Sequence, residues 1–540
     1  MISIKINGNA LELPDDFSLS LNAKSPVFNE MGSYTYPFKV KYSPRNAALL
    51  KFKNRPQNTG SIYEEFDAEL YYNNLLWMRG TLKVKIANST TFDCVFYPGE
   101  GEFYYQAKNR NLQDFDYGGQ HFNDDQEAIN WINASVMKVY PECPIGFPMV
   151  FNNNYYEDQE TGEMQYFNFY YVSDDNLHLL NTNNGRTIIV PMMYFRYVLD
   201  KLFEGMGYDF TDLAFTSDPA YNSLVLYNSV NCNNGEGGFF PYQINDLLFN
   251  YHVPRLKLND FFSGLEKYLG LCFFVNAKQK SVTLKTLNDI LSDPNSIDFS
   301  KNIVSLSVEP EDKINGFKLA MELDDDDAFK TQTENEEELS KHLKGSVETV
   351  NDLPSWPIAE DQEIRYVIDS GEYYKMIWKV WYPIDTPAVE MKTQYYYRDP
   401  KESISSKFST LIMGGNDMYC NCLNTRENFQ EITPRLFFSL YGYYGEHLLA
   451  RGYNYNPTAG SLFFNGLEGL FIQRWKNFLD FKMRTKLVKV VRYCDFLELR
   501  DLDFSRKYSI NGVHYLIKDY QVTIKKNGLS STTFSLYPVL

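Results

Sequence analysis

The two ends of the chain alternate apolar and polar residues at a period of two, and this pattern constrains the fold more than any other feature. Residues 2–6 alternate in this way, and Asn7-Gly8 then supplies the two positive-φ positions of a type I′ turn. Residues 513–524 alternate as well, but the phase slips by one residue at Lys518-Asp519, which predicts a β-bulge. The pattern therefore predicts antiparallel β structure at both ends.

Composition supports a large, β-rich globular protein. The chain has 540 residues, which favours three or four domains, and 44% of them are hydrophobic. It contains 42 Tyr and 40 Phe, residues that suit half-buried strands. No apolar run is long enough to predict a membrane-spanning helix, and the N-terminus does not resemble a secretory signal. The seven scattered cysteines predict no disulfide framework and favour a reducing compartment.

The charge is acidic and unevenly distributed. The net charge of −17 argues against a sequence-independent nucleic-acid clamp. Residues 289–363 hold 20 acidic and 6 basic residues, whereas residues 474–526 hold 13 basic and 6 acidic ones. Such asymmetry is typical of a partner surface or a lumen, and two solvated faces of opposite sign explain it equally well.

Composition and periodicity divide the chain into five segments. The class we predict is α+β and predominantly antiparallel β, with a few packed helices. The segments are an N-terminal β domain at 1–110, an extended aromatic and Asn-rich connection lying on other subunits or domains at 111–185, an α+β domain at 186–340 with an acidic loop at 322–340, an inserted small β module at 341–400, and a C-terminal β-rich domain at 401–540 with a helix near 466–481.

Two helix–strand units are predicted in the third segment. The first helix has apolar residues on one face between 195 and 206 and ends at Gly207, and the second has them between 261 and 269 and ends at Gly270. Each glycine lies 16 residues after a proline, Pro191 or Pro254. The equal spacing is compatible with an internal duplication and with two unrelated helix–glycine–strand units.

The sequence assigns no catalytic, cofactor-binding or metal-binding residue. The six histidines are scattered, and Cys420-Asn421-Cys422 lacks the spacing of a zinc or redox motif. Residues 235–238 are glycine-rich but lack the strand and helix of a phosphate-binding loop, and the four-Asp run at 324–327 lacks the glycine and distal glutamate of an EF-hand. A pair of carboxylates that converges only in space remains possible.

Tyrosine-rich stretches allow three interpretations. They occur at Tyr155-Tyr156, Tyr170-Tyr171 and residues 395–397. Tyrosines can stack on sugars, form protein–protein contacts, or pack within strands.

Several patches of sequence resemble tail-hub or tail-tip proteins of tailed phages and prophages of Bacteroidetes-type bacteria. The first patch is SPVFNEMGSYTYPF at residues 25–38, continued by Pro44-Arg45-Asn46 and the strand ending at Gly80. The others are residues 260–291 and 502–518. Within the insert, residues 345–354 and 365–369 look like a small exposed β module of phage tail and fibre proteins.

The resemblance implies a structural protein of the virion, made in the bacterial cytoplasm. Baseplate and tail hubs are ring-shaped homo-oligomers, often trimers, with tube-like β-barrel domains. They join the tail tube to the spike, tip or fibre proteins and line the channel through which the genome DNA leaves without specific binding. An acidic lumen would keep DNA from adhering.

Two other classes of function stay open. One is a tail-associated cell-wall or polysaccharide hydrolase, and the other is a receptor- or carbohydrate-binding tail protein. The sequence does not decide the number of subunits, the tail type or the neighbouring proteins.

Overall fold

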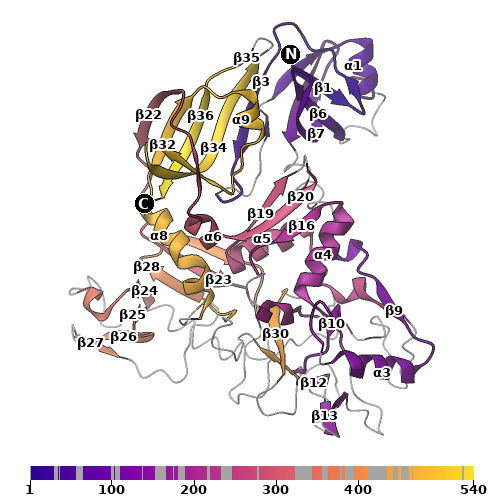
Figure 1. Ribbon diagram of the computed structural model, residues 1–540, viewed down its shortest axis with the longest axis vertical. Helices are drawn as coiled ribbons and strands as arrows, with labels where there is room; N and C mark the ends of the chain where they lie inside the picture. The colour runs from indigo at the N-terminus through magenta and orange to yellow at the C-terminus, as the bar shows by residue number, and fades with distance from the viewer. Residues whose placement is uncertain are drawn as a thin grey trace.

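The computed structural model describes most of the chain between Ile2 and Val539 (Figure 1). The residues outside the description are 1, 29–33, 36, 56, 58–64, 99–102, 104–106, 108–109, 137, 152–165, 169, 174–175, 180–188, 216–218, 231, 233–245, 277–278, 323–342, 355–362, 378–379, 384–393, 411–433, 442–447, 452–460, 465, 467, 526–527 and 540. The acidic runs at 324–327 and 336–338, the glycine-rich stretch 235–238, Tyr155-Tyr156 and Cys420-Asn421-Cys422 lie outside it.

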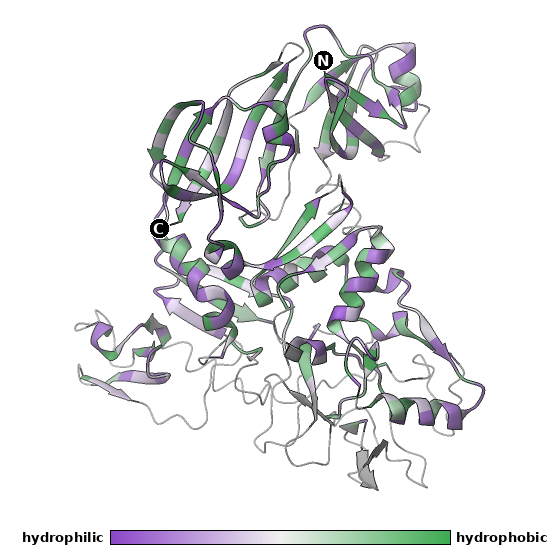
Figure 2. Ribbon diagram, in the orientation of Figure 1, coloured by the Kyte–Doolittle hydropathy of each residue, from purple (hydrophilic) through white to green (hydrophobic). Residues whose placement is uncertain are grey.

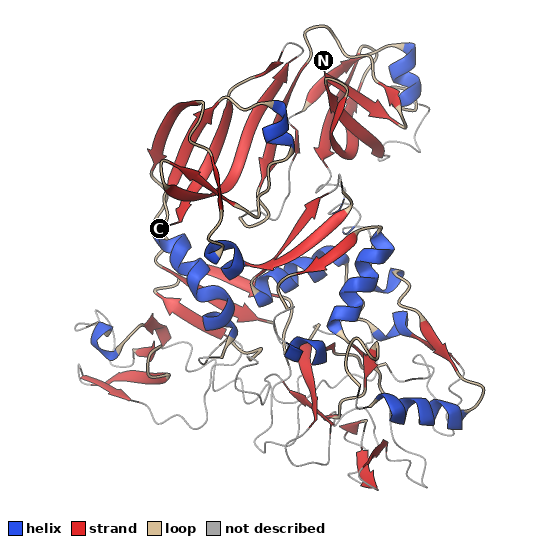
Figure 3. Ribbon diagram, viewed as in Figure 1, coloured by secondary structure: helices blue, strands red, loops and turns tan. Residues whose placement is uncertain are grey.

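The fold is α+β and predominantly antiparallel β, as the sequence predicts. Strands dominate the chain in Figure 3, and the helices gather mainly between the sheets. Apolar and polar residues alternate along the strands at both ends of the chain, as Figure 2 shows. No helix in the described part of the chain is long and apolar enough to cross a membrane.

An antiparallel sheet of six strands contains the N-terminal hairpin. Asn7 (φ 48°) and Gly8 (φ 76°) form the predicted turn with positive φ angles. The next hairpin turns at Asn73-Asn74, also with positive φ. Gly80, at which the sequence analysis ends a strand, lies inside β7 instead. The order is β2 (Asn9–Ala10), β1 (Ile2–Ile6), β6 (Glu65–Tyr72), β7 (Leu75–Ala87), β8 (Thr91–Pro98) and β5 (Phe38–Lys41).

Asn46 bridges the two opposite edges of this sheet. It lies in α1 (Pro44–Leu49), which Ser43 caps by accepting a hydrogen bond from the Asn46 backbone N–H. The fully buried Asn46 side chain accepts from the Glu12 N–H at 2.8 Å and donates to the Glu12 and Lys41 carbonyls at 2.9 and 3.0 Å. Residue 12 follows β2 and Lys41 ends β5, so this one amide closes the curved sheet.

A second, nine-stranded sheet forms from five C-terminal strands, two strands from the middle of the chain and two N-terminal ones. The predicted bulge in β34 is confirmed, because the register with β36 shifts between Ile517 and Asp519. Asn511 and Gly512 form the positive-φ turn between β33 and β34. The strands are β3 (Ser18–Lys24), β4 (Tyr34–Thr35), β21 (Ser296–Asp298), β22 (Ile303–Glu309), β32 (Leu487–Arg492), β33 (Lys507–Ile510), β34 (Val513–Lys525), β35 (Gly528–Leu529) and β36 (Thr532–Val539).

The two sheets are joined by the segment at 18–41. β3 pairs with β34 from Ser18↔Lys525 to Lys24↔Asp519, and β4 pairs with β3, whereas β5 pairs with β8 of the first sheet. Buried side chains of both sheets form one hydrophobic core, capped in part by α9 (Phe496–Arg500). The independent domain at 1–110 stays a prediction. Its strands share one core with residues near the C-terminus.

The helices of the third segment are confirmed. α4 (Phe195–Met206) and α5 (Leu258–Leu269) both end at a glycine in the left-handed conformation, with φ of 75° at Gly207 and 61° at Gly270. They pack near a three-stranded sheet of order β16 (Asp209–Asp212), β20 (Ser281–Thr286) and β19 (Leu271–Asn276), followed by α6 (Leu287–Ser292).

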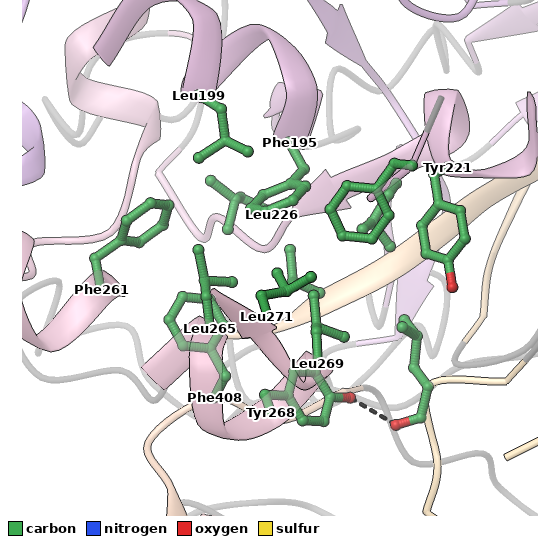
Figure 4. Packing of buried hydrophobic residues seen from close by; sticks show 14 of the residues in the cluster. Phe195, Leu199, Tyr221, Leu226, Phe261, Leu265, Tyr268, Leu269, Leu271 and Phe408 are labelled. Atoms are coloured by element: carbon green, nitrogen blue, oxygen red, sulfur yellow. Dashed lines mark hydrogen bonds between the residues drawn. The ribbon is translucent and has the colours of Figure 1, made fainter. Parts of the chain in front are cut away.

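Aromatic and aliphatic side chains fill the core between these helices. Figure 4 shows Phe195 and Leu199 of α4 above Phe261 and Leu265 of α5. The Tyr268 hydroxyl in this core donates to the Leu462 carbonyl at 2.7 Å. The high Phe and Tyr content thus serves packing here, with each buried phenol needing a hydrogen-bond partner.

The helix expected near 466–481 begins later. Gly466 has a φ of 84° and its carbonyl accepts a turn hydrogen bond from the Gly469 N–H, so Gly466 and Gly469 lie in a turn before the helix. A π-helical turn, η6 (Phe471–Trp475), leads into α8 (Lys476–Arg484). The helix packs near a sheet of β28 (Gln394–Arg398), β23 (Gly316–Met321) and β29 (Glu402–Ser406).

The inserted segment forms its own four-stranded sheet. Its strands are β24 (Leu343–Val347), β25 (Ile364–Val367), β26 (Glu372–Ile377) and β27 (Val380–Pro383), with a short helical turn η5 (Val350–Asp352). In sequence it lies between β23 and β28, which pair with each other. An insertion between two paired strands leaves their sheet intact.

The remaining elements are short, and most lie in or near the segment at 111–185. The sequence did not reveal α3 (Asp125–Ser135), whose Ile132 is buried in the largest core of the chain. The others are η2 (Leu112–Asp114), β9 (Gly119–His121), β10 (Ile145–Gly146), β11 (Val150–Phe151), β12 (Tyr166–Phe167), β13 (Tyr170–Ser173), β14 (Asn176–Leu179), β15 (Met192–Met193), η3 (Pro219–Ser223), β17 (Leu224–Leu226), β18 (Asp246–Leu248), η4 (Phe249–His252), β30 (Leu436–Tyr441) and β31 (Leu448–Arg451).

Candidate functional site: surfaces for assembly

The ionisable side chains show no convergent metal site in the described residues. No group of three or more His, Cys, Asp or Glu side chains there is placed to hold a metal ion. Five of the seven cysteines are described, and none of the five is part of a disulfide: Cys94, Cys143, Cys232 and Cys272 are buried, and Cys494 is partly exposed.

The most perturbed histidine is structural. Burial lowers the pKa of the His252 imidazole to about 3, so the ring is neutral. Its Nδ1 lies 2.9 Å from the Asn228 side-chain amide, which also donates to the Pro191 and Val230 carbonyls. This buried network ties three chain segments together, and His252 is fully covered.

Two carboxylates converge where the inserted module meets the rest of the chain. The Tyr397 hydroxyl donates to Asp480 at 2.6 Å and lies 3.4 Å from Glu348. Lys476 lies 3.3 Å from Glu348, and Arg398 lies 3.4 Å from Asp480. Burial, and then the hydrogen bond to Asp480, raise the pKa of the Tyr397 phenol. Because each carboxylate faces a cation, the group is an ion-pair network suited to holding the module.

Aromatic stacking and a close backbone contact complete this junction. Tyr366 of the module contacts Tyr395 with ring centroids 5.8 Å apart, and Tyr395 stacks on Phe471 at 4.2 Å. Gly345 has a φ of 136°, and a Cβ there would lie 1.4 Å from the Arg398 carbonyl oxygen. Tyr395 and Tyr397, for which the sequence left sugar stacking, protein–protein contact and strand packing open, are thus buried between elements of this chain.

The nine-stranded sheet ends at β22, a strand with exposed apolar side chains. β22 pairs only with β32 among the described strands and forms the last strand of the nine-stranded sheet. Leu306 and Val308 pair with Val490 and Val488, so they face the same side as those buried residues. Yet Leu306 is 47% exposed and Val308 is 59% exposed.

Sequence reasoning missed this edge, although a signal was present. Residues 304–308 read V-S-L-S-V, an alternating pattern that predicts a strand with one apolar face. The pattern could not show that this strand lies at an edge, because pairing is decided by the tertiary structure.

The residues of the first resemblance patch serve as an anchor. Ser25 is fully buried, and its backbone N–H donates to the Lys518 carbonyl at 2.9 Å. The Phe28 ring contacts Tyr537 at 5.0 Å and Phe478 at 6.2 Å between ring centroids. The segment therefore fastens the link between the two sheets onto the C-terminal strands and α8.

Comparison with known proteins identifies no family. No protein-family model matches the chain, and no curated protein matches it. Similar solved structures include the 43 kDa tail protein of prophage MuSo2 from Shewanella oneidensis, with 7% identity over 99% of this chain and 97% of that one and a TM-score of 0.34. A tail protein from Neisseria meningitidis MC58 shows 7% identity over 99% of this chain and 95% of that one, with a TM-score of 0.32.

A third similar structure is a Francisella PdpA–VgrG complex. The identity is 9% over all of this chain and 58% of that one, with a TM-score of 0.30. TM-scores this low do not establish a shared fold.

Proposed function

We propose that this chain is a structural protein of a phage tail, acting as an oligomeric hub that joins the tail tube or tail body to the tip or spike. The sequence patches at 25–38, 260–291 and 502–518 support it. The observation that carries the proposal is the exposed apolar surface of the edge strand β22. Its Leu306 and Val308 lie on the same face of the nine-stranded sheet as buried residues of β32, but are themselves exposed. An unpaired edge with exposed apolar side chains is suited to association with another chain.

The two curved sheets would supply the wall of the hub. In this proposal the strands of 1–110 and the C-terminal strands form the tube-like part, and the module at 341–400 is an appendage at the periphery. Main-chain hydrogen bonds between edges stiffen such a wall without needing a particular side-chain chemistry. Copies of the chain surround a channel for the genome DNA, and the acidic balance of the chain disfavours adhesion of DNA to the wall.

Immunogold labelling of purified virions tests this role. Antibodies against the chain are expected to place gold at one end of the tail in negative-stain images. Gold on the capsid alone, or a chain absent from purified virions by mass spectrometry, would overturn the proposal. Mass photometry of the purified chain gives a second readout, since a hub is expected to form multiples of the subunit mass.

A receptor role for the inserted module is the second candidate. Val380 and Tyr382 on its edge strand β27 are 50% and 48% exposed, and Val350 in η5 of the same module is 46% exposed. Binding of the full chain to a glycan array, lost on Tyr382→Ala, would support it. Binding that is unchanged in Tyr382→Ala, or no binding, would remove it.

The hydrolase alternative has less support from the geometry. The converging carboxylates, Glu348 and Asp480, are each neutralised by a neighbouring cation. Clearing of peptidoglycan or capsule on a zymogram that is lost in Asp480→Asn would revive it.

A further inference from the structure

The helix α8 carries two sets of contacts on opposite sides of its axis. Successive residues of an α-helix are rotated by about 100°, so Lys476 and Asp480 lie on one side of α8. Phe478, Phe481 and Lys482 lie on the opposite side. Figure 1 shows α8 between the strands of the inserted module and the nine-stranded sheet. A shift of this one helix therefore alters both sets of contacts.

The first side of α8 holds the inserted module. The Lys476 ammonium lies 3.3 Å from the carboxylate of Glu348, the residue that follows module strand β24. The Tyr397 hydroxyl donates to Asp480 at 2.6 Å and lies 3.4 Å from the same Glu348 carboxylate. Glu348 is thus tied to α8 directly and through Tyr397.

The second side of α8 holds the segment 25–28, which we call the strap. The Phe28 ring lies between α8 and the C-terminal strand β36, with centroid distances of 6.2 Å to Phe478 and 5.0 Å to Tyr537. The Lys482 ammonium lies 5.4 Å from the Phe28 centroid and 5.2 Å from the Tyr537 centroid. The strap follows β3 directly, so the nine-stranded sheet fixes its beginning and α8 fixes its end.

The two ends of α8 favour its movement as a unit. It begins at the π-helical turn η6, and irregular turns of this kind are places at which helices bend. It ends at Arg484, and only Thr485 and Lys486 separate it from β32 of the nine-stranded sheet. Rigid elements packed on both sides transmit displacements, because packed interfaces have discrete arrangements rather than continuous ones.

We propose that α8 couples the inserted module to the strap, so that loosening the module on one side of the helix releases the strap on the other, and the reverse. The coupling itself is a property of this chain alone. Its use, which is to report at the tube-forming sheets that the peripheral module has been displaced, rests on the proposed function. Coupling between two sites is reciprocal, so each side serves both as the perturbation and as the readout.

Hydrogen exchange of the full chain measures the coupling from the module side. Tyr397→Phe removes the hydroxyl that contacts Asp480 and Glu348 but keeps the ring, which lies 4.7 Å from the Phe471 ring between centroids. The backbone amides of the strap are expected to exchange at least about fivefold faster, which is the lower end of typical couplings between sites. These amides are protected in the wild type, since the Ser25 N–H donates to the Lys518 carbonyl and the Phe28 N–H to the Ser25 carbonyl.

Arg365→Met is the matched control on the module. Arg365 holds Asp399 at 2.9 Å and Glu363 at 2.7 Å, and neither residue lies on α8. This variant should also loosen the module, detected as faster exchange in β24 and β25. The strap amides should exchange as in the wild type, because the contacts with α8 are intact.

Phe28→Ala tests the reverse direction. It removes the ring from α8 and is expected to speed exchange in β24, β25 and β26 of the module at least about fivefold. Phe504→Ala is its matched control, because Phe504 is also partly exposed and stacks on a tyrosine of the nine-stranded sheet, Tyr520, at 6.1 Å, but belongs to the core of the two sheets rather than to the core that contains α8. It should leave exchange in the module unchanged. Circular dichroism checks that each variant is folded, and Phe28→Leu replaces Phe28→Ala if the alanine variant is not.

The outcomes separate this inference from the proposed function. If Tyr397→Phe and Phe28→Ala each change exchange only on their own side of α8, the coupling is refuted, whatever the gold label shows. Equal effects of the controls Arg365→Met and Phe504→Ala across the helix refute it as well, because the change is then a general loosening. If the coupling is observed but the virion tails carry no label, the coupling stands and the tail role fails.

Discussion

Replacing Asn46 by alanine should open the N-terminal sheet at the place where its two edges meet. The side-chain amide makes three hydrogen bonds with backbone groups of Glu12 and Lys41, at 2.8, 2.9 and 3.0 Å, and is fully buried. Each bond contributes on the order of 1 kcal/mol net, so their loss costs about 3 kcal/mol. The better helix propensity of alanine offsets a few tenths of a kcal/mol in α1. The expected net loss is about 2–3 kcal/mol.

Hydrogen exchange with mass spectrometry measures this loss locally, which matters because a chain of this size does not unfold in one step. Peptides covering residues 9–13 and 38–42 are expected to exchange about 30- to 150-fold faster, since each 1.4 kcal/mol is a factor of ten. Peptides of α4 and α5, which lie in a different core, should be unchanged.

Asn88→Ala is the matched control. The Asn88 side-chain oxygen Oδ1 also accepts hydrogen bonds from two backbone N–H groups, those of Thr90 and Thr91, but in an exposed turn where water can replace it. Its effect should stay below about 1 kcal/mol. Asn46→Asp should be at least as damaging as Asn46→Ala, because a carboxylate cannot donate to the two carbonyls. Exchange within threefold of wild type in Asn46→Ala, or an equal effect of Asn88→Ala, would refute the sealing role.

Three further outcomes are expected. Gly345→Ala should release the inserted module, detected as faster proteolysis at 343–383, because a Cβ would lie 1.4 Å from a carbonyl oxygen. Gly371→Ala, also at positive φ but with no atom closer than 3.9 Å, should show only backbone strain. The His252 imidazole has a pKa of about 3 in the folded chain against 6.5 ordinarily, so between these values the unfolded chain binds a proton that the folded chain does not, and stability falls as the pH drops below 6.5, by about 2 kcal/mol at pH 5. His252→Gln should therefore flatten this part of the plot of melting temperature against pH. An equal slope in wild type and variant would contradict a neutral, buried His252. Arg492→Met should lower stability by about 2 kcal/mol because buried Arg492 holds Glu498 and the Lys301 carbonyl, whereas Lys489→Met, from an exposed pair with Glu309, should change the melting point little.

The local features of this fold were predictable where a short stretch of sequence decides them. The turn at Asn7-Gly8, the ends of the helices at Gly207 and Gly270, and the bulge at Ile517–Asp519 all follow from backbone sterics or side-chain period within a few residues. The helix near 466–481 was misplaced at its start because Gly466 begins a turn there, and helix boundaries are the least defined part of a periodic pattern.

The partners of the strands were not predictable from the same patterns. Ser18–Lys24 alternates like any half-buried strand, and nothing in it indicates pairing with residues 519–525, some 500 positions away. The motif Pro44-Arg45-Asn46 resembles a family signature, but only the structure shows that Asn46 closes a sheet.

The sequence by itself determined the class of fold, the hairpins, the two long helices and the lack of a recognisable catalytic motif, because each depends on residues close together in the chain. Only the tertiary structure decided that both ends share one core, that Tyr395 and Tyr397 are buried at a junction, and that β22 is an uncovered edge. Burial and edge position depend on which distant segment supplies the covering atoms, and alternation specifies a face without specifying what covers it.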